Sequence, residues 1–321
     1  MAAEFALIVL GLAVILVAGD LLVRGAVSLA TAFSIPTLIV SLTIVAFGTS
    51  APEFFVAVRS VLDGHSGLAE GSIVGSNIAN MLLVLGVPAL IFPISAKTNG
   101  LRQHAIALLI ATAAFAAAAY LLREVDEVTG AALFAGIIVY VGYMWWRATH
   151  GEKDDPVVDE VEEYADDKKL SANTFLYILG GVVGLPIGAG LLTSHGAALA
   201  ETLGARQEII GLGLLALGTS LPELATVLAA AFRKKSDVAM GGAIGSNVFN
   251  ILAVGGASGL AGGFGFATSS LVFDIPVMLG ATAFVALFAL TRRDIGRSAG
   301  LLMTAAYFAF LTTLVLAVGA D

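Results

Sequence analysis

Two glutamates each follow a Gly-Thr-Ser-x-Pro sequence inside a long apolar segment. They are Glu53, which ends GTSAPE (residues 48–53), and Glu223, which ends GTSLPE (residues 218–223). An unpaired glutamate at membrane depth costs about 3 kcal/mol or more, so it indicates a functional site. The Gly and Pro of each motif interrupt a helix, and backbone groups freed at that depth are tolerated where they line a cavity or meet a ligand. Each motif therefore predicts an oxygen-rich cation site; the alternative is a pair of helix caps held by Ser and Glu.

A second polar motif follows each glutamate. It is GSNIAN at residues 75–80 and GSNVFN at residues 245–250. On a helix, the Ser and the last Asn of each motif are four residues apart and project from one face. For the middle residues, Asn77 and Asn247, the alternative is a hydrogen bond that joins two helices and is worth about 1 kcal/mol. The flanking residues recur in step with the glutamates, so we assign to the site Ser76, Asn80, Ser246 and Asn250.

Together the two motifs supply only oxygen ligands. The chain has no Cys, and neither motif contains His, so the predicted ligand set selects hard cations, with Ca²⁺ a better divalent candidate than the slowly dehydrating Mg²⁺. Two carboxylates neutralise one Ca²⁺ or two Na⁺. Since uncompensated buried charge is expensive, one site can hold either load but hardly both, which is the physical basis of antiport. The hydroxyl candidates are Thr49, Ser50, Ser76, Thr219, Ser220 and Ser246, and the amide candidates are Asn80 and Asn250.

The composition is that of an integral membrane protein. Of 321 residues, 58% are hydrophobic and 12% are charged, and the mean hydropathy is +0.96; soluble domains carry about 25% charged residues. A spanning helix needs about 20 apolar residues, which leaves room for about ten helices. Apolar runs predict them at residues 4–31, 37–62, 70–92, 103–122, 128–147, 173–203, 207–232, 238–262, 269–291 and 298–318. The net charge of −8 lies largely in one loop, and no basic patch indicates nucleic acid.

The two halves of the chain repeat one another. A shift of 170 residues without a gap places one glutamate motif on the other, and residues 48–86 match 218–256 at 15 of 39 positions. An odd number of helices per half makes equivalent helices run in opposite directions, as in many secondary transporters. We therefore predict an all-α membrane protein of ten transmembrane helices in two inverted five-helix repeats, with the second and seventh helices broken. The predicted divisions are a first repeat over 1–150, a linker over 151–170 and a second repeat over 171–321.

The linker is the one clearly polar stretch. It holds nine acidic residues between Glu152 and Asp167 against three lysines, which favours a flexible solvated segment; its acids lack the order and the Gly of an EF-hand calcium loop. With the predicted helices, twelve Lys and Arg fall on the linker's side of the membrane and three, Arg59, Arg123 and Arg206, on the other. The positive-inside rule then predicts a multi-pass protein of the cell membrane with a cytoplasmic linker and both termini outside.

The paired motifs resemble the alpha-1 and alpha-2 repeats of the cation/calcium exchanger superfamily, and are most similar to those of its prokaryotic sodium/calcium exchangers. The resemblance covers essentially the whole chain. It implies a core of the second, third, seventh and eighth helices around the ions, with the first and sixth sliding against it. It also implies that Glu53 and Glu223 are the central carboxylate ligands, that the hydroxyls above bind ions, and that the carbonyls of Ala46 and Ala216 coordinate Na⁺. Transported Na⁺ and Ca²⁺, the lipid bilayer, no cofactor and no obligate protein partner follow from the same resemblance.

One departure and three alternatives remain open. Relatives often carry Asp at one member of the pair that is Asn80 and Asn250 here, so a third carboxylate ligand is in doubt, as is the stoichiometry of three Na⁺ for one Ca²⁺ that the family implies. Proton-coupled calcium exchange is the near alternative, although that branch typically has Gly-Asn before its glutamate. A passive cation channel is less compatible with inverted repeats. An intramembrane enzyme is not expected, because the apolar runs contain neither a Ser–His pairing nor an Asp dyad.

Three further residues are interpreted as structural. Asp20 and Arg24 are four apart on the first predicted helix, so we expect them to pair on one face near the membrane interface. His195 falls inside the sixth predicted helix, and its position in the other half is taken by Gly25. It could titrate there, but a hydrogen-bonded packing role is the commoner one for such a residue.

Overall fold

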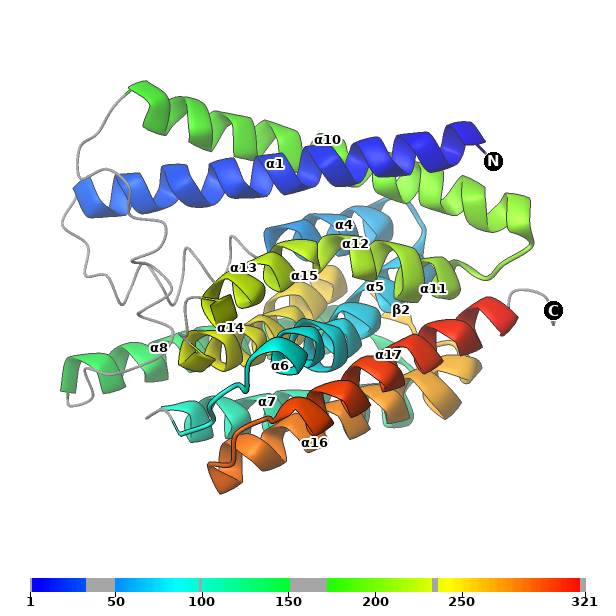
Figure 1. The fold of residues 1–321 in the computed structure, drawn as a ribbon. Helices are drawn as coiled ribbons and strands as arrows, with labels where there is room; N and C mark the ends of the chain where they lie inside the picture. Colours follow the sequence, from blue (N-terminus) through cyan, green and yellow to red (C-terminus); the bar gives the residue numbers. More distant parts are fainter. Residues whose placement is uncertain (1, 33–49, 98–99, 151–171, 233–235, 318–321) are drawn as a thin grey trace.

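The protein is a bundle of helices. The computed structural model describes residues 2–32, 50–97, 100–150, 172–232 and 236–317. Within these ranges, eight helices are long and apolar enough to cross a membrane, and the only sheet is a pair of two-residue strands, β1 (Glu124–Val125) and β2 (Phe264–Gly265). Figure 1 shows the helices lying roughly along one common direction. The prediction of an all-α membrane protein is confirmed, apart from this one short two-stranded sheet.

Helices occupy the predicted segments, with ends that differ by a few residues. The helix expected over 37–62 is described only from residue 50 onward. The α-helices are α1 (Ala2–Ala32), α4 (Ala51–Leu62), α5 (Ser66–Ala79), α6 (Gly86–Ile91), α7 (Leu101–Ala117), α8 (Glu127–His150), α10 (Ala172–Leu203), α11 (Gln207–Ile210), α12 (Ala216–Thr219), α13 (Leu221–Phe232), α14 (Ser236–Phe249), α15 (Gly255–Leu260), α16 (Ile275–Thr291) and α17 (Arg297–Ala317). Single π-helical turns join or extend them at η2 (Asn80–Val84), η3 (Ala118–Leu122), η5 (Gly211–Leu215), η6 (Asn250–Val254) and η7 (Ser270–Asp274).

Two of the π-helical turns lie at equivalent positions of the two halves. The third and eighth predicted helices, 70–92 and 238–262, each change to a π-turn, at Asn80 and at Asn250. A π-turn inserts one residue into the α-helical ladder, and such turns are frequent at functional sites. The residue types alone do not distinguish a π-turn from an α-helical turn, so the sequence could not predict them.

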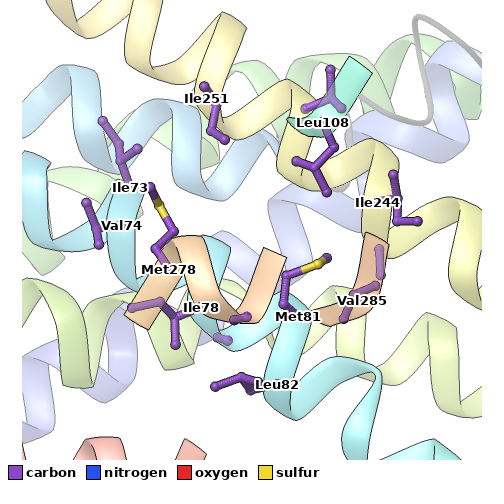
Figure 2. Close-up of a cluster of buried hydrophobic side chains, with 14 of the residues drawn as sticks. Ile73, Val74, Ile78, Met81, Leu82, Leu108, Ile244, Ile251, Met278 and Val285 are labelled. Atoms are coloured by element: carbon purple, nitrogen blue, oxygen red, sulfur yellow. The ribbon is translucent and has the colours of Figure 1, made fainter. Parts of the chain in front are cut away.

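Helix α5 lies at the centre of the apolar core. Every residue from Leu68 to Ala79 is buried. Figure 2 shows side chains of this helix, among them Ile73 and Ile78, beside Met278 of α16 and Ile251 of η6. A helix that is covered on all sides can carry polar residues only if they find partners, because an unsatisfied buried polar group costs about 1–3 kcal/mol.

Gly75 of α5 permits a close contact with the seventh predicted helix. A Cβ atom at this position would lie 2.6 Å from Cβ of Ala216 and 2.7 Å from the carbonyl oxygen of Leu212. We expect Gly75→Ala to lower the free energy of unfolding by about 1–3 kcal/mol, because backbone must shift to admit the methyl group. Gly280→Ala is the matched control, since no described atom lies within 4 Å of its Cβ position. Thermal unfolding in detergent measures both; equal midpoints would contradict the close contact.

Two long helices, α1 and α10, pack side by side along one flank of the bundle (Figure 1). They have 31 and 32 residues, slightly longer than the predicted segments 4–31 and 173–203. Their contacts run in opposite order along the two sequences: Gly11 lies against Leu191, Ile15 against Gly188 and Gly25 against Ile178. The two helices are therefore antiparallel. Their apolar contacts form a cluster separate from the main core, and it includes Ala51 and Val56 of α4.

Equivalent elements of the two halves recur at the sequence shift. Helix α4 (Ala51–Leu62) and helix α13 (Leu221–Phe232) are 170 residues apart at both ends, and so are α5 and α14, and η2 and η6. In Figure 1 the first residues of α1 and the last residues of α17 lie at one end of the bundle, whereas the last residues of α8 and the first of α10 lie at the other. The chain on either side of the acidic linker is therefore at the end opposite to the described terminal residues.

Candidate cation-binding site

The serine of each Gly-Thr-Ser-x-Pro-Glu motif departs from α-helical backbone geometry. Ser50, immediately before α4, has φ −90° and ψ 7°, and Ser220, between α12 and α13, has φ −84° and ψ 4°. These values lie in the sparsely populated bridge region, where many active-site residues are found. The cause is the proline two residues later, which has no N–H to donate to the carbonyl four residues before it. The predicted break of the seventh helix is present, and the second half of the second helix begins in the same way.

The Gly-Thr-Ser-x-Pro-Glu motif of the first half contacts that of the second half directly. Ser220 Oγ lies 3.5 Å from Oε1 of Glu53, to which it donates a hydrogen bond. The hydroxyl oxygens of Ser76 and Thr219 are 3.5 Å apart. Glu223 follows Ser220 by three residues, about one helical turn. Helix α13, which carries Glu223, packs on η2, and helix α4, which carries Glu53, packs on η6.

The site is buried. Glu53 is 1% exposed and Glu223 is 3% exposed. The other described candidates are equally covered, with the largest exposed fraction, 5%, at Ser246: Ser50, Ser76, Asn80, Thr219, Ser220, Ser246 and Asn250. Buried carboxylates in a low-dielectric environment require counter-charge. No described Lys or Arg makes an ion pair with Glu53, so the compensating charge must come from elsewhere.

Several buried polar atoms of the site have no hydrogen-bond partner among the described residues. They are Ser50 Oγ, Glu53 Oε2 and both amide atoms of Asn80 and of Asn250. Native proteins leave only a few buried polar groups per hundred residues unsatisfied, and each such group points to a missing water or ion. Four of these six atoms are oxygens of the predicted ligand set: Ser50 Oγ, Glu53 Oε2 and Oδ1 of Asn80 and of Asn250. No three described His, Asp or Glu side chains are grouped as around a metal ion, so any ion here depends on hydroxyl and amide oxygens beside the two carboxylates.

Of the remaining predicted ligands, the structure describes Ala216 only. Thr49 and Ala46 lie outside the described residues. Ala216 is buried at the start of α12, and its carbonyl oxygen accepts a hydrogen bond from the Ser220 N–H at 3.1 Å. The single hydrogen of the Thr219 hydroxyl has two acceptors in reach, the carbonyl oxygens of Leu215 at 3.1 Å and of Ala216 at 3.3 Å. A carbonyl oxygen has two lone pairs, so that of Ala216 keeps one for Na⁺ when Thr219 donates to Leu215.

The middle asparagines of the two polar motifs, Asn77 and Asn247, occupy equivalent positions of the two halves. Asn247 Nδ2 donates to the backbone oxygen of Asn77 at 2.9 Å, so its side chain joins α14 to α5. Asn77 Nδ2 donates to the backbone oxygen of Ile73 at 2.8 Å, within α5. The alternative of a hydrogen bond that joins two helices is therefore observed for Asn247 and not for the side chain of Asn77.

Three further pairs of polar side chains lie outside the repeated motifs. Arg24 Nε donates to Asp20 Oδ2 at 2.8 Å, as predicted. His195 Nδ1 lies 2.6 Å from Glu4 Oε2, so this histidine joins α10 to α1. The sequence analysis missed Glu70 and Asp274, which are 1% and 4% exposed. Neither belongs to a repeated motif; the only signal was an acidic residue inside an apolar run, the same one that identified Glu53.

Comparison with known proteins decides the family. The model of the family described as "Sodium/calcium exchanger protein" matches residues 3–146 and, a second time, residues 173–316. The chain belongs to the sodium/calcium exchanger protein family. The resemblance drawn from the two pairs of motifs is thereby confirmed, and the family's model covers each half of the chain separately.

Several relatives of this exchanger-family chain match it over nearly its whole length. It is 31% identical over 309 residues to the putative antiporter CaxA of Alkalimonas amylolytica, covering 94% of this chain and 96% of the relative. It is 29% identical over 343 residues to the sodium/calcium exchanger MaX1 of Methanosarcina acetivorans, covering 97% and 98%. Among solved structures, the sodium-calcium exchanger NCX_Mj soaked with 100 mM Na⁺ and 10 mM Sr²⁺ is similar, with 26% identity, a TM-score of 0.66 and coverage of 96% and 97%.

Proposed function

We propose that this member of the family is an antiporter that exchanges Na⁺ for Ca²⁺ at one shared site between its two halves. The observation that carries the proposal is the group of buried oxygens without partners around Glu53 and Glu223. Two carboxylates balance one Ca²⁺ or two Na⁺, and the uncompensated charge of a doubly loaded site would be costly. Binding of one ion therefore excludes the other. The relatives named as antiporters or exchangers support transport rather than an enzymatic function.

We propose further that the ligands are those predicted from the sequence. Glu53 and Glu223 contribute carboxylates from α4 and α13. Hydroxyl and amide oxygens from both halves complete the set: Thr49, Ser50, Ser76, Thr219, Ser220, Ser246, Asn80 and Asn250. The direct contacts of Ser220 with Glu53 and of Ser76 with Thr219 support a single site built from both halves. The carbonyls of Ala46 and Ala216 remain candidate Na⁺ ligands.

The architecture that we infer is two inverted repeats of five transmembrane helices, over 1–150 and 171–321, joined by the linker 151–170. The antiparallel packing of α1 on α10 and the shift of 170 residues between equivalent elements support it. Helices α1 and α10 would slide together over the core to open the site to each side in turn. Their separate apolar cluster supports such motion, because its contacts with α4 are made mainly by aliphatic side chains.

We infer a cell-membrane location with the linker in the cytoplasm and both termini outside. The distribution of Lys and Arg carries this inference, and the opposite placement of the linker's flanks and the described terminal residues is compatible with it. No cofactor and no obligate protein partner are required for exchange; the bilayer and the two cations suffice.

Calcium flux into proteoliposomes with Na⁺, K⁺ and pH gradients imposed one at a time tests the function. An outward Na⁺ gradient should drive Ca²⁺ uptake, whereas K⁺ or pH gradients alone should not. Uptake driven by the pH gradient and indifferent to Na⁺ would establish the calcium/proton antiporter instead. Uptake that needs no counter-ion and does not saturate would establish a channel.

Exchange of three Na⁺ for one Ca²⁺ would move one net charge in each cycle. A potential of 100 mV changes the free energy of such a cycle by about 2.3 kcal/mol, or about 50-fold in the Ca²⁺ ratio at equilibrium. We expect a K⁺ diffusion potential set with valinomycin to shift Ca²⁺ accumulation by about this factor. Accumulation that is independent of voltage would indicate two Na⁺ per Ca²⁺.

A further inference from the structure

A large apolar groove runs between α7 and α8, away from the exchange site. Its volume is about 890 Å³, within the range of about 300–1,000 Å³ for pockets that hold whole small molecules. The lining extends along α7 and η3 from Gln103 to Leu122, or about 28 Å at 1.5 Å per residue. Both helices are long and apolar enough to cross a membrane. The groove therefore follows the depth of the bilayer.

Small side chains leave the space for this groove. Ala111 and Ala114 of α7 are three residues apart, so they share one face of the helix, and Gly136 of α8 lines the same space. The inner wall includes Leu252 of η6, which is 9% exposed. A Cβ atom at Gly136 would lie 3.2 Å from Cδ2 of Leu252. The groove thus reaches the π-turn that begins at Asn250.

The groove is open on the side that faces the bilayer. Three of its lining residues are largely exposed: Ile110 is 66% exposed, Leu121 is 79% exposed and Val139 is 70% exposed. No charged residue is part of the lining. A bound water needs two to four polar partners, which most of this surface does not offer, whereas an acyl chain needs none. The occupant that suits the groove is therefore a lipid chain.

One end of the groove is basic. His104 Nδ1 lies 2.5 Å from the Tyr140 hydroxyl, so the start of α7 is beside the last turns of α8. Arg102 is exposed at the start of α7. The guanidinium carbon of Arg147, near the end of α8, lies 5.9 Å from the ring centroid of Tyr143, which lines the groove. Two cationic side chains therefore flank the end of the groove that is nearest the linker.

The opposite end of the groove is acidic. The turn between the two helices carries three acidic residues, Glu124, Asp126 and Glu127, against one basic residue, Arg123, and all four are exposed. Unlike charges attract and like charges repel, so an anionic headgroup is favoured at the linker's end and disfavoured at this one. Basic pockets between transmembrane helices are known to bind anionic lipid headgroups.

Aromatic residues place the basic end at the level of the headgroups. Tyr143 stacks on Trp146 with the ring centroids 6.5 Å apart. Trp145 and Trp146 are 46% and 57% exposed. Exposed Trp and Tyr gather where the hydrocarbon of a membrane meets water. Arg147, which follows Trp146, is therefore at the depth of a lipid phosphate.

We propose that the groove binds one anionic phospholipid from the leaflet on the linker's side. One acyl chain lies along α7 and α8, and the phosphate lies at the end that carries Arg102 and Arg147. The acyl chain packs against Leu252, so the lipid is a structural ligand of η6. The assignment does not use the ion ligands or the exchange proposed above, and it can hold or fail without them.

Native mass spectrometry of the delipidated full-length protein in detergent tests the proposal. The probes are phosphatidylglycerol, which is anionic, and phosphatidylcholine, which is zwitterionic, with identical acyl chains. We expect one phosphatidylglycerol to bind saturably, about 30-fold more tightly than phosphatidylcholine, because each basic residue near a membrane surface contributes about a fivefold attraction. Arg102→Gln/Arg147→Gln should abolish this preference. Equal affinity of the unchanged chain for the two lipids would overturn the proposal.

A substitution inside the groove tests its position. Val139→Trp puts a larger ring into the groove and should weaken phosphatidylglycerol binding more than tenfold. Ile138→Trp is the matched control, because this neighbouring residue of α8 is 64% exposed and does not line the groove; it should bind the lipid as the unchanged chain does. Equal binding by the two variants would overturn the groove as the site. A dimer in place of the lipid adduct, lost in Val139→Trp, would identify a second copy of the chain as the occupant and would also overturn the proposal.

Thermal unfolding of the unchanged chain gives a second measurement that no variant can spoil by misfolding. A ligand that binds only the folded state stabilises it, so phosphatidylglycerol should raise the unfolding midpoint of the delipidated protein, and the same concentration of phosphatidylcholine should raise it less. Equal midpoints with the two lipids would contradict a specific anionic lipid at this groove.

Discussion

Glu53→Gln is expected to abolish Ca²⁺ uptake into proteoliposomes loaded with Na⁺, and Glu223→Gln to do the same. Each change keeps the shape of the side chain but removes half of the charge that balances Ca²⁺. Removing one partner of a buried charge pair costs about 3–5 kcal/mol, which corresponds to a loss of more than about 100-fold in Ca²⁺ affinity at 1.4 kcal/mol per tenfold change. Initial rates of ⁴⁵Ca²⁺ uptake measure the effect.

The control for these two variants is Glu127→Gln. Glu127 opens α8 and is exposed, so the same chemical change there should leave uptake unaltered. Glu53→Asp keeps the charge and should retain part of the activity. Undiminished uptake by either the Glu53 or the Glu223 variant, at equal amounts of reconstituted protein, would contradict the assignment of the two glutamates as ligands.

Tying α10 to α4 is expected to stop exchange. Thr193 of α10 donates from Oγ1 to Asp63 Oδ2, at the end of α4, over 3.4 Å. Because the chain has no Cys, Thr193→Cys/Asp63→Cys introduces a single reactive pair. If α10 slides over the core, a short thiol cross-linker between these residues should remove more than nine-tenths of the flux. A reducible linker should restore it on cleavage, and each single variant should be insensitive to the reagent.

A cross-link within the sliding pair is the control. Glu4 of α1 and His195 of α10 are in contact over 2.6 Å, so Glu4→Cys/His195→Cys accepts the same reagent. Since α1 and α10 are proposed to move together, this cross-link should preserve flux. Equal inhibition of flux by the two cross-links would mean that α1 and α10 move relative to one another. Flux that persists in the Thr193–Asp63 cross-linked protein would mean that α10 does not slide on α4.

Much of the helix arrangement could be predicted from the sequence because apolar length and helix-breaking residues are local properties. The backbone conformations of Ser50 and Ser220 follow from Pro52 and Pro222, each of which lacks a backbone donor. The repeated motif also predicted that Ser220 and Glu53 share a site, although they are 167 residues apart. Because the two halves repeat one another, the sequence indicates a contact between distant residues that a single copy of the motif would not reveal.

Other features could not be predicted because they depend on contacts without a repeated signal. The π-turns begin at Asn80 and Asn250, and residue type alone does not distinguish a π-turn from an α-helical turn. Glu70 accepts a hydrogen bond from the N–H of Ala267, 197 residues further along the chain, and the repeat has Met240 in place of Glu70. Asp274 lies within a predicted apolar helix, and only the fold shows which residues surround it.

Competition between the two ions tests mutual exclusion most directly. The measurement is equilibrium binding of ⁴⁵Ca²⁺ to the purified protein at fixed total Ca²⁺ while Na⁺ is raised. If Glu53 and Glu223 form one shared site, Na⁺ should displace all bound Ca²⁺, with a dependence on Na⁺ concentration steeper than first order. Ca²⁺ that stays bound at saturating Na⁺ would contradict the shared site.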